Sequence, residues 1–386
     1  MADDTSLQIL NSIRSVAGSE YQARIPEAVR TNIETVGNTI LSYTPHLNLF
    51  LTNLINRIGK VSVERMDEVD DIYAVFAESK LSKGDTIQRI FIDIPKAHAF
   101  EGSNTMNPAS MLAVEKGVIH VEYTSVDRRM FYKRSISMAE LKEAFISVEA
   151  LDDFVRGVID SMLTALGYDK YIMVTETLYK HCCYVIEGGV SGSETYRVLA
   201  VPETVAKYNK TSGEIEWDTV GAKAFLKMLR VLTGNLKFPH ELAYYTADAQ
   251  GEVDDEYTIS AQRTPREKQI LGLEVSSLAN IDVDALATLF NLEKADLKTQ
   301  VIELEDGALG SFVDSDSGEH YIGGFLCSKD AVSRGTSFEN NDSFKNPEHE
   351  YVNFWKHFWG WMAVSKFKDF VPIVFKPYTP TQSEGE

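Results

Sequence analysis

His181, Cys182 and Cys183 place two thiol nucleophiles beside a possible base. A nucleophilic cysteine must lie within hydrogen-bonding reach of the base that activates it. Consecutive residues of a helix point about 100° apart, so on a helix His181 and Cys182 would not face one another. Three cysteines, two of them adjacent, also cannot make a disulfide framework. We therefore interpret them as structural thiols of a chain made in a reducing cytosol.

Two motifs resemble known binding loops but lack residues that those loops require. GGVSGS at 188–193 resembles the G-x-S-x-G nucleophile elbow, but Ser193 replaces the final glycine, and no phosphate-loop Lys-Ser or Lys-Thr follows. DSDSGE at 314–319 would need glycine at 319 and an acid at 325 to form an EF-hand loop, and has Glu319 and Phe325 instead. We predict a flexible connection and a solvated acidic turn, although a weaker divalent site of another kind at the turn stays open.

The histidines give no support for a metal centre. The eight histidines never recur at spacings of three to five residues with a matching carboxylate. Every catalytic motif thus fails its spacing test. The sequence predicts no catalytic residue, no cofactor and no bound metal, and it favours a structural protein over an enzyme.

The charge of the chain limits its partners. Its 386 residues include 57 acidic and 38 basic side chains, which gives a formal charge of −19. So acidic a surface repels phosphate, which disfavours a dedicated nucleic-acid-binding protein and an anionic membrane as partner. No apolar run has the length of a membrane span, and the start, MADDTSLQIL, does not resemble a secretory signal. The length predicts about two or three compact units.

Apolar periodicity predicts helices first and strands next. Residues 1–59 carry apolar residues at helical steps, in pieces that Gly37 interrupts. From 60 to 137 the period becomes two, as in IFIDI at 90–94 and VIHVEYT at 118–124. A long two-stranded excursion with sparse apolar cover is poorly suited to standing alone in water. We therefore expect this excursion to lie on something.

The strongest helix signal is a stripe of eight apolar residues between 151 and 166. They are Leu151, Phe154, Val155, Val158, Ile159, Met162, Leu163 and Leu166. Their steps of 0, 3, 4, 7, 8, 11, 12 and 15 define one helix face. Gly167 interrupts the pattern, which later apolar residues resume toward Gly188. Burial of the eight side chains contributes about 12–24 kcal/mol as an upper estimate, so we predict that this helix organises a domain.

The rest of the chain predicts mixed helices and strands. We expect a strand at 196–201, a helix at 220–233 closed by Gly234, a solvated acidic loop at 248–256, helices within 281–299 and strands within 301–326. The aromatic segment 351–377 is predicted to begin as a helix and to end as the strand DFVPIVF. Pro372 cannot donate to a ladder, so this strand should lie at an edge or end near the proline.

Arg128, Arg129, Lys133 and Arg134 form the densest basic cluster of this acidic chain. The cluster fits either a solvated strand face or a patch that meets an acidic surface on a neighbouring subunit. The aromatic residues between 351 and 361 exceed one helix face, so we expect part of them to meet another element.

Five segments carry a further signal. They are IPEAVRTNIETVGNTIL (25–41), FLTNLINRIGKV (50–61), LKEAFISVEALDDFV (141–155), IDVDALATLFNLEKADL (281–297) and EYVNFWKHFWGWMAVSKF (350–367). Together, and in this order, they resemble the major capsid proteins of small podovirus-type tailed phages, the phi29-like group. The similarity spans most of the chain and is faint at about 185–275 and 305–345. None of the segments is a catalytic fingerprint.

The resemblance implies an α+β fold of the Hong Kong 97 type. Such a fold has an N-terminal arm, an extended two-stranded loop, a peripheral domain built on a spine helix, and an axial domain. In this chain they would be residues 1–59, 60–137, 138–204 with 346–377, and 205–345, followed by a disordered tail at 378–386. The immunoglobulin-like domain that follows the fold in a well-known relative is not expected, since only about ten residues follow the last strand.

The resemblance further implies the major capsid protein of a tailed double-stranded DNA phage, which is not an enzyme. It would be made in the host bacterial cytoplasm and self-assemble as hexamers and pentamers into the icosahedral or prolate shell of the virion. Portal and scaffolding proteins would be its partners, and an acidic lining would let packaged DNA slide without sequence-specific binding. The extended loop would lie across an adjacent subunit, where the basic cluster of 128–134 would contact acidic residues.

Two alternatives stay open. An encapsulin-like compartment for protein cargo would share the fold, and packaged DNA with a portal would distinguish a phage head from it. An unrelated cytosolic α+β enzyme with scattered site residues would be a monomer or small oligomer, whereas a shell protein forms particles of megadalton mass.

Overall fold

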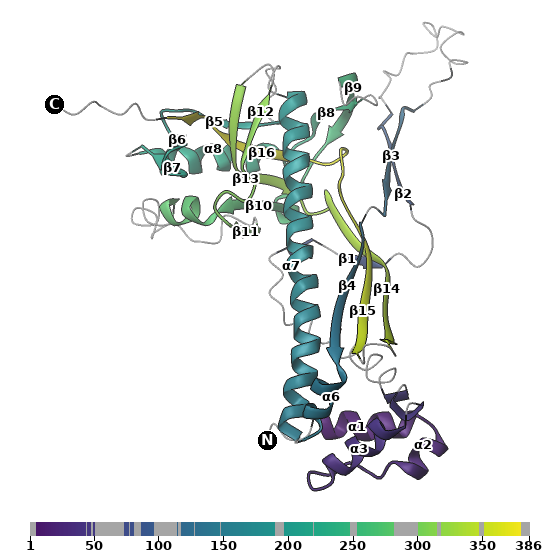
Figure 1. Ribbon diagram of the computed structural model, residues 1–386. Coiled ribbons are helices and arrows are strands. Elements are labelled where there is room, and N and C mark those ends of the chain that lie inside the picture. Colours follow the sequence, from purple (N-terminus) through teal and green to yellow (C-terminus); the bar gives the residue numbers. More distant parts are fainter. Residues whose placement is uncertain are drawn as a thin grey trace, which may run out of the picture.

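The computed structural model describes residues 5–43, 45–47, 49–50, 73–76, 78–80, 86–95, 114, 117–126, 128–146, 148–189, 197–218, 220–247, 253–281, 300–314, 318–346 and 351–379. A single long helix, α7 (Val148–Gly189), runs through the molecule, and the other elements are arranged along it (Figure 1). Short helices gather at its N-terminal end, a four-stranded sheet lies beside its middle, and a larger sheet and two hairpins surround its C-terminal end.

The helices at the N-terminal end of α7 share one core. They are α1 (Thr5–Val16), α2 (Ser19–Arg24), α3 (Ile33–Ser42) and α6 (Met138–Ala144). The helical pieces predicted within 1–59 are thus confirmed up to residue 50, and residues 51–59 lie outside the described part. The sequence predicts an interruption at Gly37, but α3 continues through this residue. A Cβ there would lie 2.5 Å from the Cβ of Phe145, so the missing side chain lets α3 pack against the end of α6.

Helix α7 confirms the predicted helix at 151–166 and continues it without a break through Gly167. An isolated glycine costs a helix only about 1 kcal/mol, which packing at both ends outweighs. Of the eight predicted stripe residues, Leu166 is fully buried, and Phe154 and Met162 pack against the N-terminal core. The side chains of the other five, Leu151, Val155, Val158, Ile159 and Leu163, lie outside the described residues.

A four-stranded sheet of order β1-β14-β15-β4 lies against the middle of α7. Its strands are β1 (Glu78–Lys80), β14 (Val332–Asn346), β15 (Tyr351–Val364) and β4 (Arg128–Ser137). The helix predicted at the start of 351–377 is wrong, because β15 is the central strand of this sheet. Aromatic residues favour strands, and a short, nearly continuous apolar run cannot be told from a buried helix by periodicity.

The sheet joins segments that the resemblance assigned to different domains. Strand β4 falls in the expected extended loop, 60–137, and β14 in the expected axial domain, 205–345. Both strands nevertheless pair with β15 along most of their length. Hydrogen-bonded strands of one sheet form one body, so 128–137 and 332–346 belong structurally with β15.

Around the C-terminal end of α7, a second sheet is covered by a helix on each face. Its order is β11-β10-β13-β16-β5, with β12 beside β13. The strands are β5 (Leu199–Val201), β10 (Gln269–Glu274), β11 (Gln300–Leu304), β12 (Ser311–Asp314), β13 (Gly318–Ser328) and β16 (Phe370–Phe375). Alternate residues of one strand face opposite layers: Ile270 packs with α7 and Leu271 with α8 (Gly221–Asn235). The strands predicted within 301–326 are confirmed, and the strand predicted at 196–201 is confirmed for 199–201.

Two expectations for this region need adjustment. Helix α8 passes through Gly234, which had been expected to close it. Strand β16 is not an edge strand, since it lies between β13 and β5. The expectation for Pro372 nevertheless holds in part, because β5 pairs with β16 only from Ile373 onward and leaves the proline beyond its reach.

Smaller strands complete the fold. A three-stranded sheet contains β6 (Ala206–Asn209), β7 (Glu214–Trp217) and β17 (Pro377–Tyr378), and a short 3-10 helix spans Arg266–Lys268. The hairpin of β8 (His240–Ala247) and β9 (Val253–Gln262) takes in residues 253–256 of the acidic loop predicted at 248–256, because the buried Ile259 anchors β9 against β8, and residues 248–252 lie outside the described part. The helices predicted within 281–299 lie outside the described residues except for Ile281, which is the last described residue of a helical segment that begins at 275.

The predicted two-stranded excursion is present as a hairpin of β2 (Thr86–Ile92) and β3 (Ile119–Ser125). It stands at the C-terminal end of α7, to the right of that helix in Figure 1. None of the described helices combines the length and the apolarity needed to span a membrane.

Replacement of Gly37 by alanine tests the packing of α3 on α6. We expect Gly37→Ala to lower the free energy of unfolding by about 1–3 kcal/mol, because the new methyl group would overlap Phe145. Gly157→Ala is the matched control, since a Cβ at that helical glycine meets nothing within 4 Å and should add about 0.5–1 kcal/mol. Urea unfolding of the purified protein measures both. Equal effects of the two substitutions would contradict the packing argument.

Candidate assembly surfaces

The cysteines have the properties of structural thiols. Cys182 and Cys327 are buried, and burial raises the pKa of both thiols, so neither forms the thiolate that a nucleophile needs. Cys183 is half-buried, and burial raises its pKa as well. The ring of His181 packs edge-on against Phe370, with 4.7 Å between ring centroids, and burial with the nearby Lys366 charge lowers its pKa to about 3. The prediction that this cluster is not catalytic agrees with its geometry.

The acidic motif at 314–319 lies at a hairpin turn. Asp314 pairs with Gly318 where β12 meets β13, and Gly318 adopts a φ of +88° that suits glycine. Residues 315–317 lie outside the described part, as do residues 190–193 of the flexible connection predicted at 188–193, whose first two residues, Gly188 and Gly189, belong to α7 instead. Within the described residues, no three His, Cys, Asp or Glu side chains are grouped closely enough to hold a metal ion.

The pleat of β4 divides the predicted basic cluster between two faces. Arg128 and Arg134 have the parity that faces α7, and Arg128 donates to Glu176 of that helix at 2.8 Å. Hydrogen bonds from Lys180 and Arg128 lower the pKa of Glu176. Arg129 and Lys133 have the opposite parity and therefore lie on the other face. The four cations do not form one patch, and their contact with a neighbouring subunit stays a prediction.

The face of this sheet that points away from α7 is rich in aromatic rings. We name it the aromatic face and define it by Phe131 of β4, Phe338 and Phe344 of β14, and Trp355, His357 and Trp359 of β15. Phe131, Phe338 and Phe344 are 62%, 41% and 59% exposed. Each outward cation covers a tryptophan, with Arg129 4.9 Å from the ring centroid of Trp359 and Lys133 5.7 Å from that of Trp355.

The hairpin of β2 and β3 contacts its own chain through its more polar face. Phe91 and His120 pack among Tyr244 and Phe367, and His120 Nδ1 lies 2.7 Å from the Tyr244 hydroxyl. The Glu122 carboxylate accepts hydrogen bonds from the Ser365 hydroxyl at 2.8 Å and from the backbone N–H of Lys366 at 3.2 Å. The expectation that this excursion lies on something is thus met for one of its faces.

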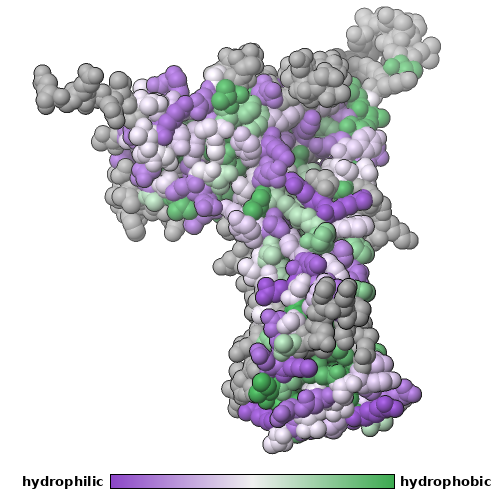
Figure 2. Space-filling model, viewed as in Figure 1, coloured by the Kyte–Doolittle hydropathy of each residue, from purple (hydrophilic) through white to green (hydrophobic). Residues whose placement is uncertain are grey.

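The opposite face of the hairpin is apolar and points into solvent. We name it the hairpin apolar face and define it by Ile90, Ile92, Ile119, Val121 and Tyr123. Ile90, Ile92 and Ile119 are 58%, 61% and 61% exposed. Hydrophobic side chains gather over the hairpin in Figure 2. A one-sided sheet in water normally has the reverse arrangement, so this face is suited to a partner.

A buried ion pair lies at the base of the neighbouring hairpin. His240 Nε2, at the start of β8, is 2.8 Å from Asp369 Oδ1, and the Thr264 hydroxyl donates to Asp369 Oδ2 at 2.5 Å. Burial alone would lower the pKa of His240, but the hydrogen bond and negative charge of Asp369 outweigh it, and the pKa is raised. The pair thus ties β8 to the start of β16.

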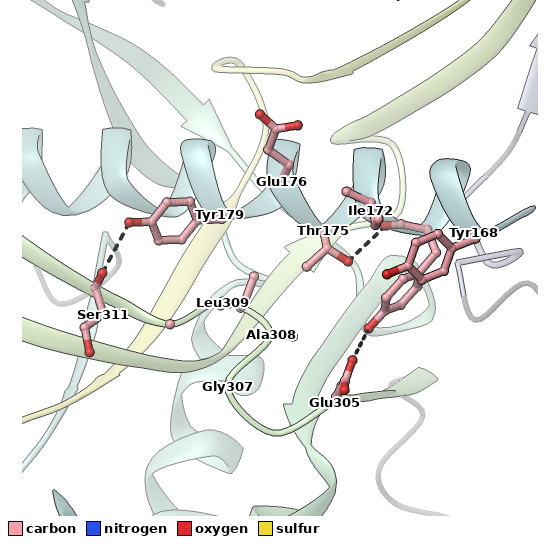
Figure 3. A pocket seen from close by; sticks show the side chains of 12 residues that line it. Tyr168, Ile172, Thr175, Glu176, Tyr179, Glu305, Gly307, Ala308, Leu309 and Ser311 are labelled. Carbon is pink, nitrogen blue, oxygen red and sulfur yellow. Dashed lines mark hydrogen bonds between the residues drawn. The ribbon is translucent and has the colours of Figure 1, made fainter. Parts of the chain in front are cut away.

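An open groove of about 450 Å³ runs between α7 and the loop 305–311 (Figure 3). Its helix wall carries Tyr168, Ile172 and Tyr179. The Tyr179 hydroxyl donates to the carbonyl of Ser311 at 3.2 Å, and the Tyr171 hydroxyl donates to Glu305 at 3.3 Å. These hydroxyls hold the loop on the helix. Burial, together with the charge of Glu305, raises the pKa of Tyr171. The groove therefore offers a binding surface and no activated acid or base.

Comparisons with known proteins agree on one family. The model of a family described as Phi29-like phage major capsid protein matches residues 10–374. The major capsid protein of Streptococcus phage Cp-1 is 23% identical over 367 residues, which are 95% of this chain and 93% of that protein. The major capsid protein of Bacillus phage PZA is 24% identical over 372 residues, 96% of this chain and 73% of that protein. A chain from the capsid structure of Staphylococcus phage Andhra has a TM-score of 0.50 at 11% identity, covers 78% of this chain and 83% of its own, and is thus alike in fold.

The His240–Asp369 pair predicts a pH dependence of stability. Because the folded pKa of His240 is raised, its contribution is fully present below the ordinary histidine pKa of about 6.5 and is lost as the pH rises through the folded value. His240→Gln should therefore destabilise the protein most at acidic pH and progressively less above about pH 6.5. Urea unfolding of both proteins across this range measures the difference in unfolding free energy. In an Asp369→Asn background, this difference should no longer depend on pH. A difference that grows with pH would contradict the assignment.

Proposed function

This chain belongs to the phi29-like phage major capsid protein family, and from that premise we propose that its copies form hexamers and pentamers. It is the major capsid protein of a tailed double-stranded DNA phage, a structural component of the virion and not an enzyme. A capsid protein self-assembles into a shell. Membership of this family decides against the encapsulin-like compartment and the cytosolic enzyme.

The exposed hairpin apolar face is the observation that best indicates how copies contact one another. Glu122 and His120 hold the more polar face of the hairpin on the chain, so the opposite face cannot turn onto its own chain without breaking these contacts. Full burial of an isoleucine side chain contributes about 1.5–3 kcal/mol, and the three isoleucines here are more than half exposed. A neighbouring copy that covers this face gains a large part of that free energy. We therefore assign the hairpin to the contact between adjacent copies.

The shape of this contact suits rings. A hairpin that projects from one copy onto a different surface of the next makes a heterologous contact, in which the two partners contribute unlike patches. Repetition of such a contact closes into a ring when the rotation per copy is a simple fraction of a full turn. Six-fold and five-fold rings of this kind tile a closed shell.

The charge of the chain supports a second part of the proposal. With a formal charge of −19, an interior lining of such subunits repels the phosphate backbone. Packaged DNA would thus meet no sequence-specific site and could move during packaging and ejection. Portal and scaffolding proteins, met in the host bacterial cytoplasm during assembly, complete the proposed set of partners.

A paired substitution on the hairpin tests the role of its exposed face. Ile92 and Ile119 lie directly opposite one another, and we expect Ile92→Asn with Ile119→Asn to reduce the yield of closed shells at least tenfold. The folded chain should keep its unfolding midpoint within a few degrees, because both side chains are exposed. Electron microscopy and sedimentation, under conditions in which the unmodified chain forms shells, measure the yield.

The matched control replaces the same two residues by valine, which keeps the apolar face and the strand propensity. This control should form shells normally. An asparagine pair that also assembles like the unmodified chain would refute the assignment of the hairpin to the contact between copies.

A further inference from the structure

We propose that the exposed side of α8 points into the lumen of the shell and contacts the phosphate backbone of the packaged DNA. This inference rests on the proposed function, in which the shell encloses DNA. We name the surface the basic face of α8 and define it by Lys223, Lys227, Arg230 and Lys237. The supporting observations are the placement of these cations, their lack of carboxylate partners, and the composition of the surface.

The sequence of α8 directs its cations to one side of the helix. Lys223, Lys227 and Arg230 are exposed and follow steps of 0, 4 and 7, so they line one helix face over about 10 Å. The opposite side of α8, with Phe225 and Leu229, is buried against the second sheet. Packing on the sheet therefore fixes the direction in which the three cations point.

The cations of this face have no acidic partners within the chain. Helix α8 contains no aspartate or glutamate, although acidic residues outnumber basic ones by 57 to 38 in the whole sequence. Among the described residues, none of the four cations of the basic face forms an ion pair. By contrast, Lys170, Lys180 and Lys210 of other elements each pair with a carboxylate. The basic face is thus available to an anion from outside the chain.

The segment beside the end of α8 adds to the positive charge. The backbone N–H of Thr264 donates to the carbonyl of Leu236 at 2.7 Å, which brings residues 263–268 next to the helix end. A Cβ at Gly234 would lie 3.6 Å from Nη2 of Arg266, so this guanidinium also lies against α8. Within 263–268, three cations stand against one carboxylate, that of Glu267.

The composition of this face favours a nucleic acid over a second protein copy as the partner. Protein–protein interfaces are depleted of lysine, whereas interfaces with DNA are polar and much more positively charged. Lysine and arginine clustered along one helix are the electrostatic footprint of a phosphate contact. Lysine contacts a phosphate as a point charge on a flexible stem, so a duplex can slide past such a face. The acidic remainder of the chain keeps the attraction local.

Photo-crosslinking at two exposed phenylalanines tests the inference. Phe238 lies beside the basic face, with Lys237 Nζ 4.6 Å from its ring centroid, and Phe131 of the aromatic face is the matched control. The two are 57% and 62% exposed. Benzoylphenylalanine at position 238 should give nucleotide adducts in DNA-filled heads and none in empty shells, as detected by mass spectrometry after nuclease digestion. The same probe at position 131 should give none.

Three outcomes of this experiment would overturn the inference. They are the absence of adducts at position 238 in filled heads, equal adducts at positions 238 and 131, and crosslinks from position 238 to another copy of the chain. The last outcome would assign the basic face to a contact between copies instead.

A triple substitution measures the phosphate contacts. Loss of three cations should make the slope of log K against log salt concentration shallower by about 2.7 for a duplex of about 30 base pairs, since each lost contact removes about 0.9. The substitutions are Lys223→Gln, Lys227→Gln and Arg230→Gln. Fluorescence anisotropy of the labelled duplex with the unassembled chain gives the slope. Absence of binding by the unmodified chain would contradict the inference.

The matched control removes the same amount of charge from other surfaces and should leave the slope unchanged. It combines three substitutions at exposed cations outside α8, Arg24→Gln, Lys80→Gln and Lys142→Gln. Equal changes of slope in both triple variants would refute a contact specific to the basic face. Both variants should form shells like the unmodified chain, and a loss of shells from the α8 variant alone would also overturn the inference.

These outcomes are distinguishable from a failure of the proposed function. Normal shells from the Ile92 and Ile119 asparagine pair refute the proposed hairpin contact. DNA-filled heads without adducts at position 238 refute the inference about α8 alone.

Discussion

The polar contacts of Glu122 and His120 on the β2–β3 hairpin decide which of its faces the molecule can bury. Glu122 accepts hydrogen bonds from Ser365 and Lys366, and His120 lies against Tyr244, so the more polar face is held on the chain. The consequence is that Ile90, Ile92 and Ile119 stand in solvent. The hydrophobic effect then favours any arrangement in which another surface covers them. A monomer that satisfies its hydrogen bonds in this way leaves apolar surface exposed to water. Assembly removes this surface from water.

Helix α7 supplies the rigid frame on which these surfaces are displayed. Its N-terminal half packs with the N-terminal helices, and its C-terminal half packs Val174, Leu178 and Cys182 against the second sheet. Because one continuous helix of 42 residues joins both cores, the hairpin at one end and the aromatic face along the middle keep a fixed relation. The proposed ring contact needs such a rigid frame, since a flexible subunit would not repeat the same rotation from copy to copy.

The sequence predicts the parts of the fold in which one period dominates. The helix at 151–166 and the alternating strands around 90–92 and 119–124 appear as expected, although the apolar side of the hairpin faces solvent and its more polar side faces the body. The prediction of a helix at the start of 351–377 is wrong, since a central strand with aromatic residues on both faces has spacings that also fit a helix. The step-of-two run Trp355, His357 and Trp359 was the available signal for the aromatic face. The division of the basic cluster could not be foreseen until 128–137 was known to be one regular strand, and no local pattern indicates that Glu122 rather than Ile119 faces the body.

Hydroxyl-radical footprinting of the side chains of Ile92 and Ile119, before and after assembly, tests most directly whether apolar strand surface holds the copies together. The account predicts that both residues are oxidised readily in the unassembled protein, where each is 61% exposed, and become protected several-fold in closed shells. Exposed valines such as Val16, away from the hairpin, provide the internal reference. Equal oxidation of the two isoleucines in both states would contradict the account.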